Sequence, residues 1–310
     1  MTKEEFQALL DHSVKEARAI LPQGKVADYI PELKKAKSDQ LGIVLTDLDG
    51  NIFASGDTEQ AFTMQSIVKV FALIYALETL GEDVVFEKVG MEPSGASFME
   101  MTTLSDFSNK PSNPLINAGA LVIASMISQD IDFQQFLDYI SGLCASDGLK
   151  VNEAVFDSEL NHSERNHALS WELKRLHLLT NSLEDTLLFY TRGCAVELTA
   201  RELSGFAVIL ANGGFDPLSG EQKVDPDVVK TTLTLLFTCG LYNGTGEFAV
   251  RIGLPAKSGV GGGILAAAHQ RFGIGAFGPS LDIYGNSIGA IKVLSELSAK
   301  YDWHTFAWSK

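Results

Sequence analysis

The chain has 310 residues, of which 45% are hydrophobic and 20% charged, and its formal net charge at pH 7 is −15. This composition supplies enough apolar material for a large soluble core. The acidic balance argues against nucleic acid as a partner, because a phosphate backbone is bound by a basic surface. Three widely spaced cysteines indicate reduced thiols rather than a disulfide framework or a metal-binding knuckle.

The N-terminal segment predicts an amphipathic surface helix. It is acidic from residue 4 and lacks the basic head and apolar centre of an export signal. The longest apolar stretches, 70–77 and 116–127, are shorter than the roughly 20 residues that cross a bilayer. We therefore expect a cytoplasmic protein without a membrane partner.

The following segments predict a hairpin and then a helical region. Residues 41–57 are rich in β-formers on either side of Asp49-Gly50, a dipeptide that supplies the positive φ angles of a tight hairpin turn. From 66 to about 210 the pattern is helical, and the last helix begins with a capping box at Thr199 and Glu202. Asn212-Gly213-Gly214 supplies its left-handed exit.

The C-terminal part predicts a helix at 228–238, short strands within 253–279 and a terminal amphipathic helix at 287–301. Strands at both chain ends imply one antiparallel sheet flanked by helices, with a mostly helical lobe inserted. The predicted class is α/β (α+β). We divide the single catalytic domain into a sheet lobe of 1–65 and 225–310 and a helical lobe of 66–224.

Ser66 and Lys69 stand at the start of a long apolar run. Residues three apart on a helix share a face, so the hydroxyl and the amine can be neighbours if the helix begins near Gln65. An amine deprotonates serine only if its pKa lies well below about 10.4, and burial would lower it. The helix N-terminus also offers N–H groups for a developing oxyanion.

A Ser-x-x-Lys match alone is weak, because one arises by chance on the order of once in such a chain. A second element, Lys257-Ser258-Gly259, adds context. It has the Lys-Ser/Thr-Gly form that borders the substrate in serine β-lactamases and penicillin-binding proteins. A second cation there is expected to help depress the pKa of Lys69.

Further segments resemble the serine-dependent glutaminases, a branch of the serine β-lactamase/transpeptidase-like fold. They follow the family's order and span nearly the whole chain: GKVADYIPEL (24–33), MQSIVK (64–69), EPSG (92–95), NPLINAGAL (113–121), SELNHSERNHA (158–168), FYTRGCAVELT (189–199), LANGG (210–214), CGLYNGTGEFA (239–249), GLPAKSGVGGGI (253–264) and GPSLDIYGNS (278–287). The resemblance implies hydrolysis of L-glutamine to L-glutamate and ammonia through a γ-glutamyl-serine intermediate. It also implies no cofactor and no metal, and a homo-oligomer, either a dimer or a tetramer.

The resemblance assigns the catalytic centre. Ser66 is the nucleophile, Lys69 activates it, and Tyr29 and Tyr242 lie at the same centre. We expect the pKa of Tyr242 to fall below about 10 beside two lysines, so that it relays a proton to ammonia or activates the deacylating water. Whether Lys69 or Tyr242 is the base in each half-reaction stays open, and Lys257 is auxiliary.

The resemblance also assigns a substrate-binding set. Its members are Gln65, Asn117, Glu159, Asn166, Tyr190, Tyr242 and the backbone of Val260. Glu159 suits the α-ammonium of glutamine, whereas Asn117, Asn166 and Tyr190 can donate to its carboxylate. The backbone N–H groups of Ser66 and Val260 would form the oxyanion hole. The glycines at 259–263 predict an edge strand that approaches a ligand closely.

Two alternatives stay open on this scaffold. One is a penicillin-interacting serine hydrolase or peptidase, which the lack of an export signal disfavours. The other is a catalytically silent member that binds amino acids. Turnover of glutamine separates both from a glutaminase.

Overall fold

The computed structural model describes residues 2–94 and 110–308, and Gly95, the last residue of one matched segment, lies outside them. The strands are β1 (Gly42–Asp47), β2 (Ile52–Gly56), β3 (Phe62–Thr63), β4 (Lys150–Val151), β5 (Val196–Leu198), β6 (Phe215–Asp216), β7 (Glu221–Gln222), β8 (Ala256–Ser258), β9 (Gly263–Ala268) and β10 (Phe272–Phe277). The α-helices are α1 (Lys3–Ala17), α2 (Val68–Leu80), α3 (Glu82–Lys88), α4 (Asn117–Ile127), α5 (Phe133–Leu143), α6 (Glu153–Leu160), α7 (Glu164–Arg175), α8 (Leu183–Cys194), α9 (Ala200–Ala211), α10 (Pro226–Cys239), α11 (Thr245–Arg251) and α12 (Ile288–Tyr301). The 3₁₀-helices are η1 (Arg18–Gln23), η2 (Leu33–Lys35), η3 (Gln65–Ile67) and η4 (Tyr242–Gly244).

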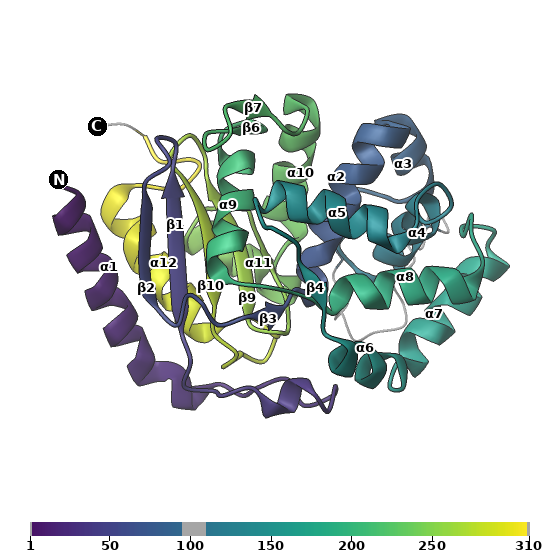
Figure 1. Cartoon of the computed structure of the whole chain (residues 1–310), viewed down its shortest axis with the longest axis horizontal. Coiled ribbons are helices and arrows are strands. Elements are labelled where there is room, and N and C mark those ends of the chain that lie inside the picture. The colour runs from purple at the N-terminus through teal and green to yellow at the C-terminus, as the bar shows by residue number, and fades with distance from the viewer. Residues whose placement is uncertain (1, 95–109, 309–310) are drawn as a thin grey trace.

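The large sheet joins the two ends of the chain, as the sequence predicts. Its order is β2-β1-β10-β9-β8, and every neighbouring pair is antiparallel (Figure 1). The β1–β2 turn differs from the expectation, because Gly50 has a φ of +79° while Asp49 is not in the positive-φ region. The side chain of Asp47 accepts from the N–H groups of Asp49 and Asn51, which stabilises a loop wider than a two-residue turn.

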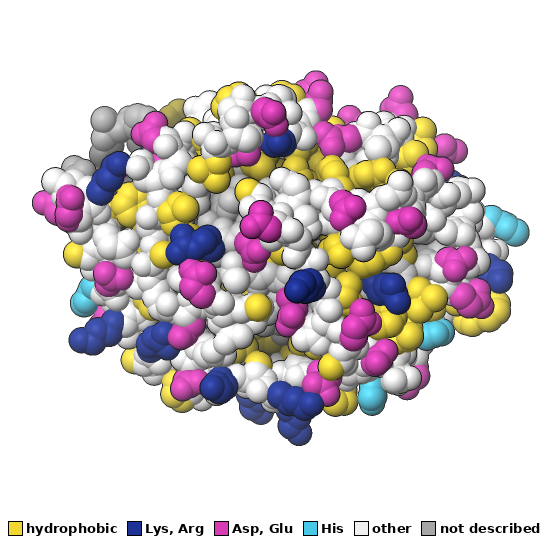
Figure 2. All heavy atoms as spheres, viewed as in Figure 1, with side chains coloured by type: hydrophobic (Ala, Val, Ile, Leu, Met, Phe, Trp, Pro, Cys, Tyr) yellow, Lys and Arg dark blue, Asp and Glu magenta, His cyan; other side chains and the backbone are white. Residues whose placement is uncertain are grey.

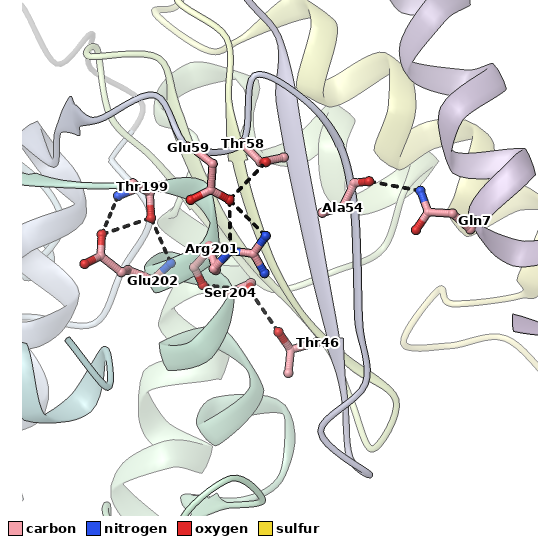
Figure 3. Close-up of polar contacts among 9 residues, drawn as sticks. All are labelled: Gln7, Thr46, Ala54, Thr58, Glu59, Thr199, Arg201, Glu202 and Ser204. Atoms are coloured by element: carbon pink, nitrogen blue, oxygen red, sulfur yellow. Dashed lines mark hydrogen bonds and ion pairs between the residues drawn. The ribbon is translucent and has the colours of Figure 1, made fainter. Parts of the chain in front are cut away.

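Helix α9 packs directly on one face of this sheet. The facing strand, β10, has glycines at 273 and 275, and a Cβ atom at Gly275 would lie 2.1 Å from the carbonyl oxygen of Ala200. Thr46 of β1 and Ser204 of α9 share a buried hydrogen bond of 2.9 Å across the interface (Figure 3). The missing side chains therefore allow the backbone of the helix to approach the strand.

The start of α9 contains the predicted capping box. The Thr199 hydroxyl accepts from the N–H of Glu202 at 3.2 Å, and the Glu202 carboxylate accepts from the N–H of Thr199 at 2.8 Å (Figure 3). Arg201 forms an ion pair of 2.9 Å with Glu59, which follows β2. After the helix, Gly213 has a φ of +66°. Both predicted ends of this helix are confirmed.

Helices α1 and α12 cover the other face of the sheet (Figure 1). Side chains of β1 alternate between the two faces, so that Val44 belongs to the core with α9 while Ile43 and Leu45 belong to the core with α1 and α12. Gln7 of α1 donates to the carbonyl of Ala54 on the edge strand β2 at 2.9 Å (Figure 3). The sheet is therefore sandwiched between two helical layers.

The remaining helices pack beside the sheet around a small three-stranded sheet of order β3-β5-β4. Helices α2, α4 and α8 share one apolar core with α9. Helix α10 begins at Pro226 rather than 228, because Asp225 caps it and proline is favourable at its first position. The two-lobe division, with 66–224 as the helical part, stays a prediction.

On the face that Figure 2 shows, Lys and Arg side chains stand singly or in pairs among Asp and Glu. In the described part of the chain, no helix is both long and apolar enough to cross a membrane.

Candidate active site

Ser66 lies in η3, between the short strand β3 and helix α2. The N–H of Met64 donates to the carbonyl of Val196 at 2.8 Å, which extends the β3–β5 pairing to the edge of the turn. Gln65 has a φ of +48°, a left-handed conformation that costs a non-glycine residue about 1–3 kcal/mol and that clusters at functional sites. A 3₁₀ turn therefore presents Ser66 at the start of α2, near where the sequence predicts the helix to begin.

Ser66 faces a cavity of about 200 Å³. The predicted site residues that line it are Tyr29, Gln65, Ser66, Asn117, Glu159, Asn166, Tyr190 and Tyr242. They come from segments spread over most of the chain, and the fold collects them around one hydroxyl. Three members of the predicted set, Lys69, Lys257 and Val260, do not line this cavity.

Tyr242 is the hydrogen-bond partner of Ser66. It lies in η4 with a φ of +52°, the second non-glycine residue of the site with a left-handed backbone. Burial raises the pKa of the Tyr242 hydroxyl above its ordinary value, and the hydrogen bond with Ser66 opposes only part of that rise. The expected fall in this pKa is therefore wrong, because desolvation of the phenolate outweighs the nearby lysines.

Tyr29 lies at the mouth of the cavity, where its side chain is 45% exposed. Burial of its hydroxyl raises the pKa of Tyr29, and negative charge on Tyr242 and Glu159 would raise it further. Both tyrosines are therefore neutral hydrogen-bonding groups near pH 7.

Lys69 is buried, with only 2% of its surface exposed. Its amine donates to Asn117 Oδ1 at 2.7 Å and to the carbonyl of Leu115 at 3.1 Å. Burial lowers the pKa of Lys69 to about 8, while negative charge on Cys194 and Glu159 would oppose the shift. A neutral amine is therefore accessible near physiological pH, which is what activation of a serine requires.

Lys257 is even more buried, at 1% exposed. Its amine donates to the carbonyl of Ser258 at 2.6 Å and lies 4.5 Å from the ring centre of Tyr242. Burial and then the charge of Lys69 lower the pKa of Lys257. The expectation that Lys257 depresses the pKa of Lys69 is wrong, because burial lowers the pKa of Lys69 and the charge of Lys69 acts on Lys257 instead. The amine of Lys257 lies over the face of the Tyr242 ring.

Glu159 is a buried acid whose position matches the predicted ammonium partner. Gln65 donates to its Oε2 at 3.2 Å. Burial raises the pKa of Glu159 to about 7, and the hydrogen bond from Gln65 and the charge of Lys69 oppose part of the rise. Asn117 completes the link by donating to Asn166 Oδ1 at 3.1 Å. A chain of hydrogen bonds therefore joins Lys69 to two of the predicted carboxylate donors, Asn117 and Asn166.

Several lining residues were missed by the sequence analysis: Ile30, His162, Ser163, Glu164, Arg165 and Cys194. Arg165 and its neighbours lie in the matched segment 158–168, so the motif itself held the signal. Cys194 is buried, its carbonyl accepts from Gln65 at 3.4 Å, and its thiol is hydrogen-bonded to the Tyr190 hydroxyl. Burial raises the pKa of Cys194, so its thiol is neutral.

The glycines at 259–263 serve a different purpose from the one expected. Residues 259–262 form the turn between β8, which is the edge strand of the sheet, and β9. A Cβ atom at Gly259 would lie 2.4 Å from the carbonyl oxygen of Met64, and one at Gly261 would lie 2.5 Å from that of Thr63. The glycines therefore allow this turn to approach the segment before Ser66. Val260 belongs to the same turn, between Gly259 and Gly261 in the sequence.

Across the described residues, no group of three or more His, Cys, Asp or Glu side chains is arranged to hold a metal ion.

The fold and the site define a protein of the serine β-lactamase-like class: an antiparallel sheet between helices, with a serine at the start of a buried helix beside it. A family model described as glutaminase matches residues 24–306. The chain belongs to the glutaminase family, and the predicted fold class and family are confirmed.

Relatives and solved structures agree. The chain is 41% identical to a glutaminase of Clostridium tetani, over 97% of this chain and all of the relative. It is 35% identical to a solved structure of a probable glutaminase from Bacillus subtilis complexed with 6-diazo-5-oxo-L-norleucine, with a TM-score of 0.89 over 97% of this chain and 96% of the other. A covalent complex between the Bacillus subtilis glutaminase YbgJ and 5-oxo-L-norleucine is also 35% identical, with a TM-score of 0.87 over 96% and 98% of the two chains.

Proposed function

We propose that this protein is a glutaminase that hydrolyses the side-chain amide of L-glutamine to L-glutamate and ammonia through a γ-glutamyl-serine intermediate. The observation that carries the proposal is the single cavity in which Ser66 meets the amino-acid-binding set, with the buried Lys69 one helical turn away. Support also comes from the relatives, since one of them forms a covalent complex with a norleucine derivative.

In the acylation step, neutral Lys69 takes the proton of the Ser66 hydroxyl, and Ser66 Oγ forms a bond to the amide carbon of glutamine. The negative charge on the carbonyl oxygen is stabilised by backbone N–H groups of Ser66 and Val260. The carbon–nitrogen bond then breaks. Tyr242 gives its proton to the departing nitrogen and regains one from the Lys69 ammonium, so that ammonia leaves and Lys69 is neutral again.

In the deacylation step, water forms a bond to the same carbon and gives a proton to Lys69. The bond between carbon and Ser66 Oγ breaks, and the proton returns to Ser66. The raised pKa of Tyr242 favours Lys69 over Tyr242 as the base in both half-reactions, because a phenolate is scarce near pH 7.

The polar network fixes the head group of glutamine. Ionised Glu159 binds the α-ammonium, and its affinity is strengthened because the acid is buried. The amides of Asn117 and Asn166 and the hydroxyl of Tyr190 donate to the α-carboxylate. Arg165 lines the same cavity and adds a positive charge on the carboxylate side.

Replacement of Ser66 by alanine tests this proposal. We expect glutamate and ammonia release from glutamine to fall to background in Ser66→Ala, while the variant still binds glutamine and is stabilised by it against heat. Full activity in the variant would refute the mechanism. Absence of turnover in the parent protein would favour the silent amino-acid binder, and labelling by a fluorescent penicillin would favour the penicillin-interacting class.

We also propose that the protein is a cytoplasmic homo-oligomer, a dimer or a tetramer. The family resemblance supports this proposal. Light scattering coupled to size-exclusion chromatography measures the mass directly, and a monomeric mass would refute the proposal.

A further inference from the structure

A second cavity, of about 390 Å³, adjoins the active site. Its walls come from residues 93–94, from the segment that leads into α4 and from residues 238–246 around the end of α10 and the start of α11. Among the described residues, Tyr242 alone lines both cavities. The two cavities therefore share the hydrogen-bond partner of Ser66 as a lining residue.

The described residues that line the second cavity are uncharged. Its described residues include hydroxyl and amide side chains, such as Thr238 and Asn243, and apolar ones, such as Leu115 and Ile116. The first cavity, in contrast, is lined by Glu159, Glu164 and Arg165. Charged head groups are therefore favoured in the first cavity, whereas the second suits small neutral molecules that accept or donate hydrogen bonds.

The second cavity also borders the groups that handle protons. Tyr242 is hydrogen-bonded to Ser66, and the carbonyl of Leu115 accepts from the amine of Lys69 at 3.1 Å. Thr245, another lining residue, donates to the carbonyl of Tyr242 at 2.7 Å and accepts from the N–H of Leu241 at 2.9 Å. These two hydrogen bonds hold the backbone that carries Tyr242.

We propose that the second cavity is the route by which ammonia leaves and the hydrolytic water enters, while the amino-acid head group occupies the first cavity. The inference rests on the proposed glutaminase function. Bound substrate fills the cavity in front of Ser66, so a small molecule needs another path to the acyl carbon. Ammonia departs when the carbon–nitrogen bond breaks, and water takes its place and forms the new carbon–oxygen bond, with both molecules neutral in transit.

Gly246 offers a way to block this route. It lies in the first turn of α11 and lines the second cavity, and a Cβ atom there would meet no heavy atom within 4 Å. Gly246→Phe therefore adds bulk to the cavity without a clash at its Cβ position. Val250→Phe is the matched control, because it adds an aromatic ring on the same helix at a side chain that is 78% exposed and outside both cavities.

The test compares turnover with a reaction that needs neither ammonia release nor water entry. We expect kcat for glutamine to fall about tenfold in Gly246→Phe, since exchange of small molecules becomes limiting, with KM unchanged or lower. The rate at which 6-diazo-5-oxo-L-norleucine inactivates the variant should stay within about twofold of the parent rate. Unchanged kcat would overturn the proposal, and so would a parallel loss of turnover and inactivation, which would indicate general damage to the site.

Chemical labelling of Cys239, at the end of α10, provides a second and independent way to obstruct the cavity. Cys239 is partly exposed and lines the second cavity, whereas Cys144 and Cys194 are buried. Methyl methanethiosulfonate should convert the Cys239 thiol to a methyl disulfide and lower kcat in the parent protein, and larger thiosulfonates should lower it further. Cys239→Ala should abolish this sensitivity. Full activity of the labelled parent would overturn the proposal.

Failure of the route and failure of the proposed function are distinguishable. If the parent protein releases no ammonia from glutamine, the proposed function is wrong. If the parent turns over and the blocked forms turn over equally well, only the route is wrong.

Discussion

Lys69 and Glu159 are buried ionisable groups whose pKa values both lie near neutrality, at about 8 and about 7. Burial is the largest cause in each case, because it disfavours the charged form of either group. The two groups are coupled, since charge on one opposes the shift of the other. Catalysis needs the charged form of Glu159 and the neutral form of Lys69. Both forms predominate only above the higher of the two pKa values, about 8.

This electrostatic arrangement predicts the pH dependence of turnover. We expect kcat/KM for glutamine to reach a plateau above pH 8, to fall about tenfold per pH unit below the Lys69 pKa of about 8, and to fall more steeply below the Glu159 pKa of about 7. Initial rates of ammonia release from pH 6 to 9.5 measure it. A profile that is flat over this range would contradict the assignment of Lys69 as the base.

Glu159→Gln should stabilise the folded protein above pH 7. The folded state holds a proton on Glu159 up to about pH 7, whereas the unfolded chain loses it near 4.5, so the wild-type protein loses stability as pH rises between these values. The full effect is about 3 kcal/mol. Denaturant unfolding should therefore give similar free energies for the variant and the parent at pH 4.5, and a higher one for the variant at pH 8. An equal or lower value at pH 8 would show that Glu159 does not carry this burial cost.

At the scale of the elements, the contact between α9 and β10 holds the sheet against the helices that carry the site. The contact depends on the absence of side chains at 273 and 275, because backbone atoms of α9 occupy the places of their Cβ atoms. No change of side-chain rotamer can make room for a Cβ atom there, because the nearest atoms that it would meet belong to the backbone of α9.

Gly275→Ala should lower the free energy of unfolding by about 1–3 kcal/mol or more, because α9 must move away from the sheet. Gly142→Ala is the matched control, since an added Cβ atom in α5 meets no heavy atom within 4 Å and alanine is the better helix former. Thermal or denaturant unfolding of the two variants checks the comparison. Equal stabilities would show that the sheet tolerates a displaced α9.

At the scale of the whole molecule, the sequence predicted what depends on local pattern and ordered motifs. The hairpin, the capping box at Thr199 and the pairing of strands from both chain ends follow from periodicity and turn residues, and all are present. Eight of the residues that line the cavity were predicted from matched segments: Tyr29, Gln65, Ser66, Asn117, Glu159, Asn166, Tyr190 and Tyr242.

Among the properties that depend on burial, the lowered pKa of Lys69 was predicted correctly, whereas the behaviour of Tyr242 and Lys257 was not. The pKa of Tyr242 rises, and the pKa of Lys257 is lowered by burial and by the charge of Lys69, because desolvation depends on how deeply each group is enclosed by distant parts of the chain. Cys194 and Arg165 line the cavity and were missed, although both lie in matched segments, at 189–199 and 158–168. Their residue types alone did not set them apart from their neighbours in those segments.

The most direct test of the central claim is the identity of the residue that carries the acyl group. Acid quenching during turnover of glutamine, followed by mass spectrometry of peptides, should find one glutamyl group on Ser66 in the wild-type protein and none in Ser66→Ala, which should also release no ammonia. A glutamyl group on another residue, or turnover in the variant, would contradict the account.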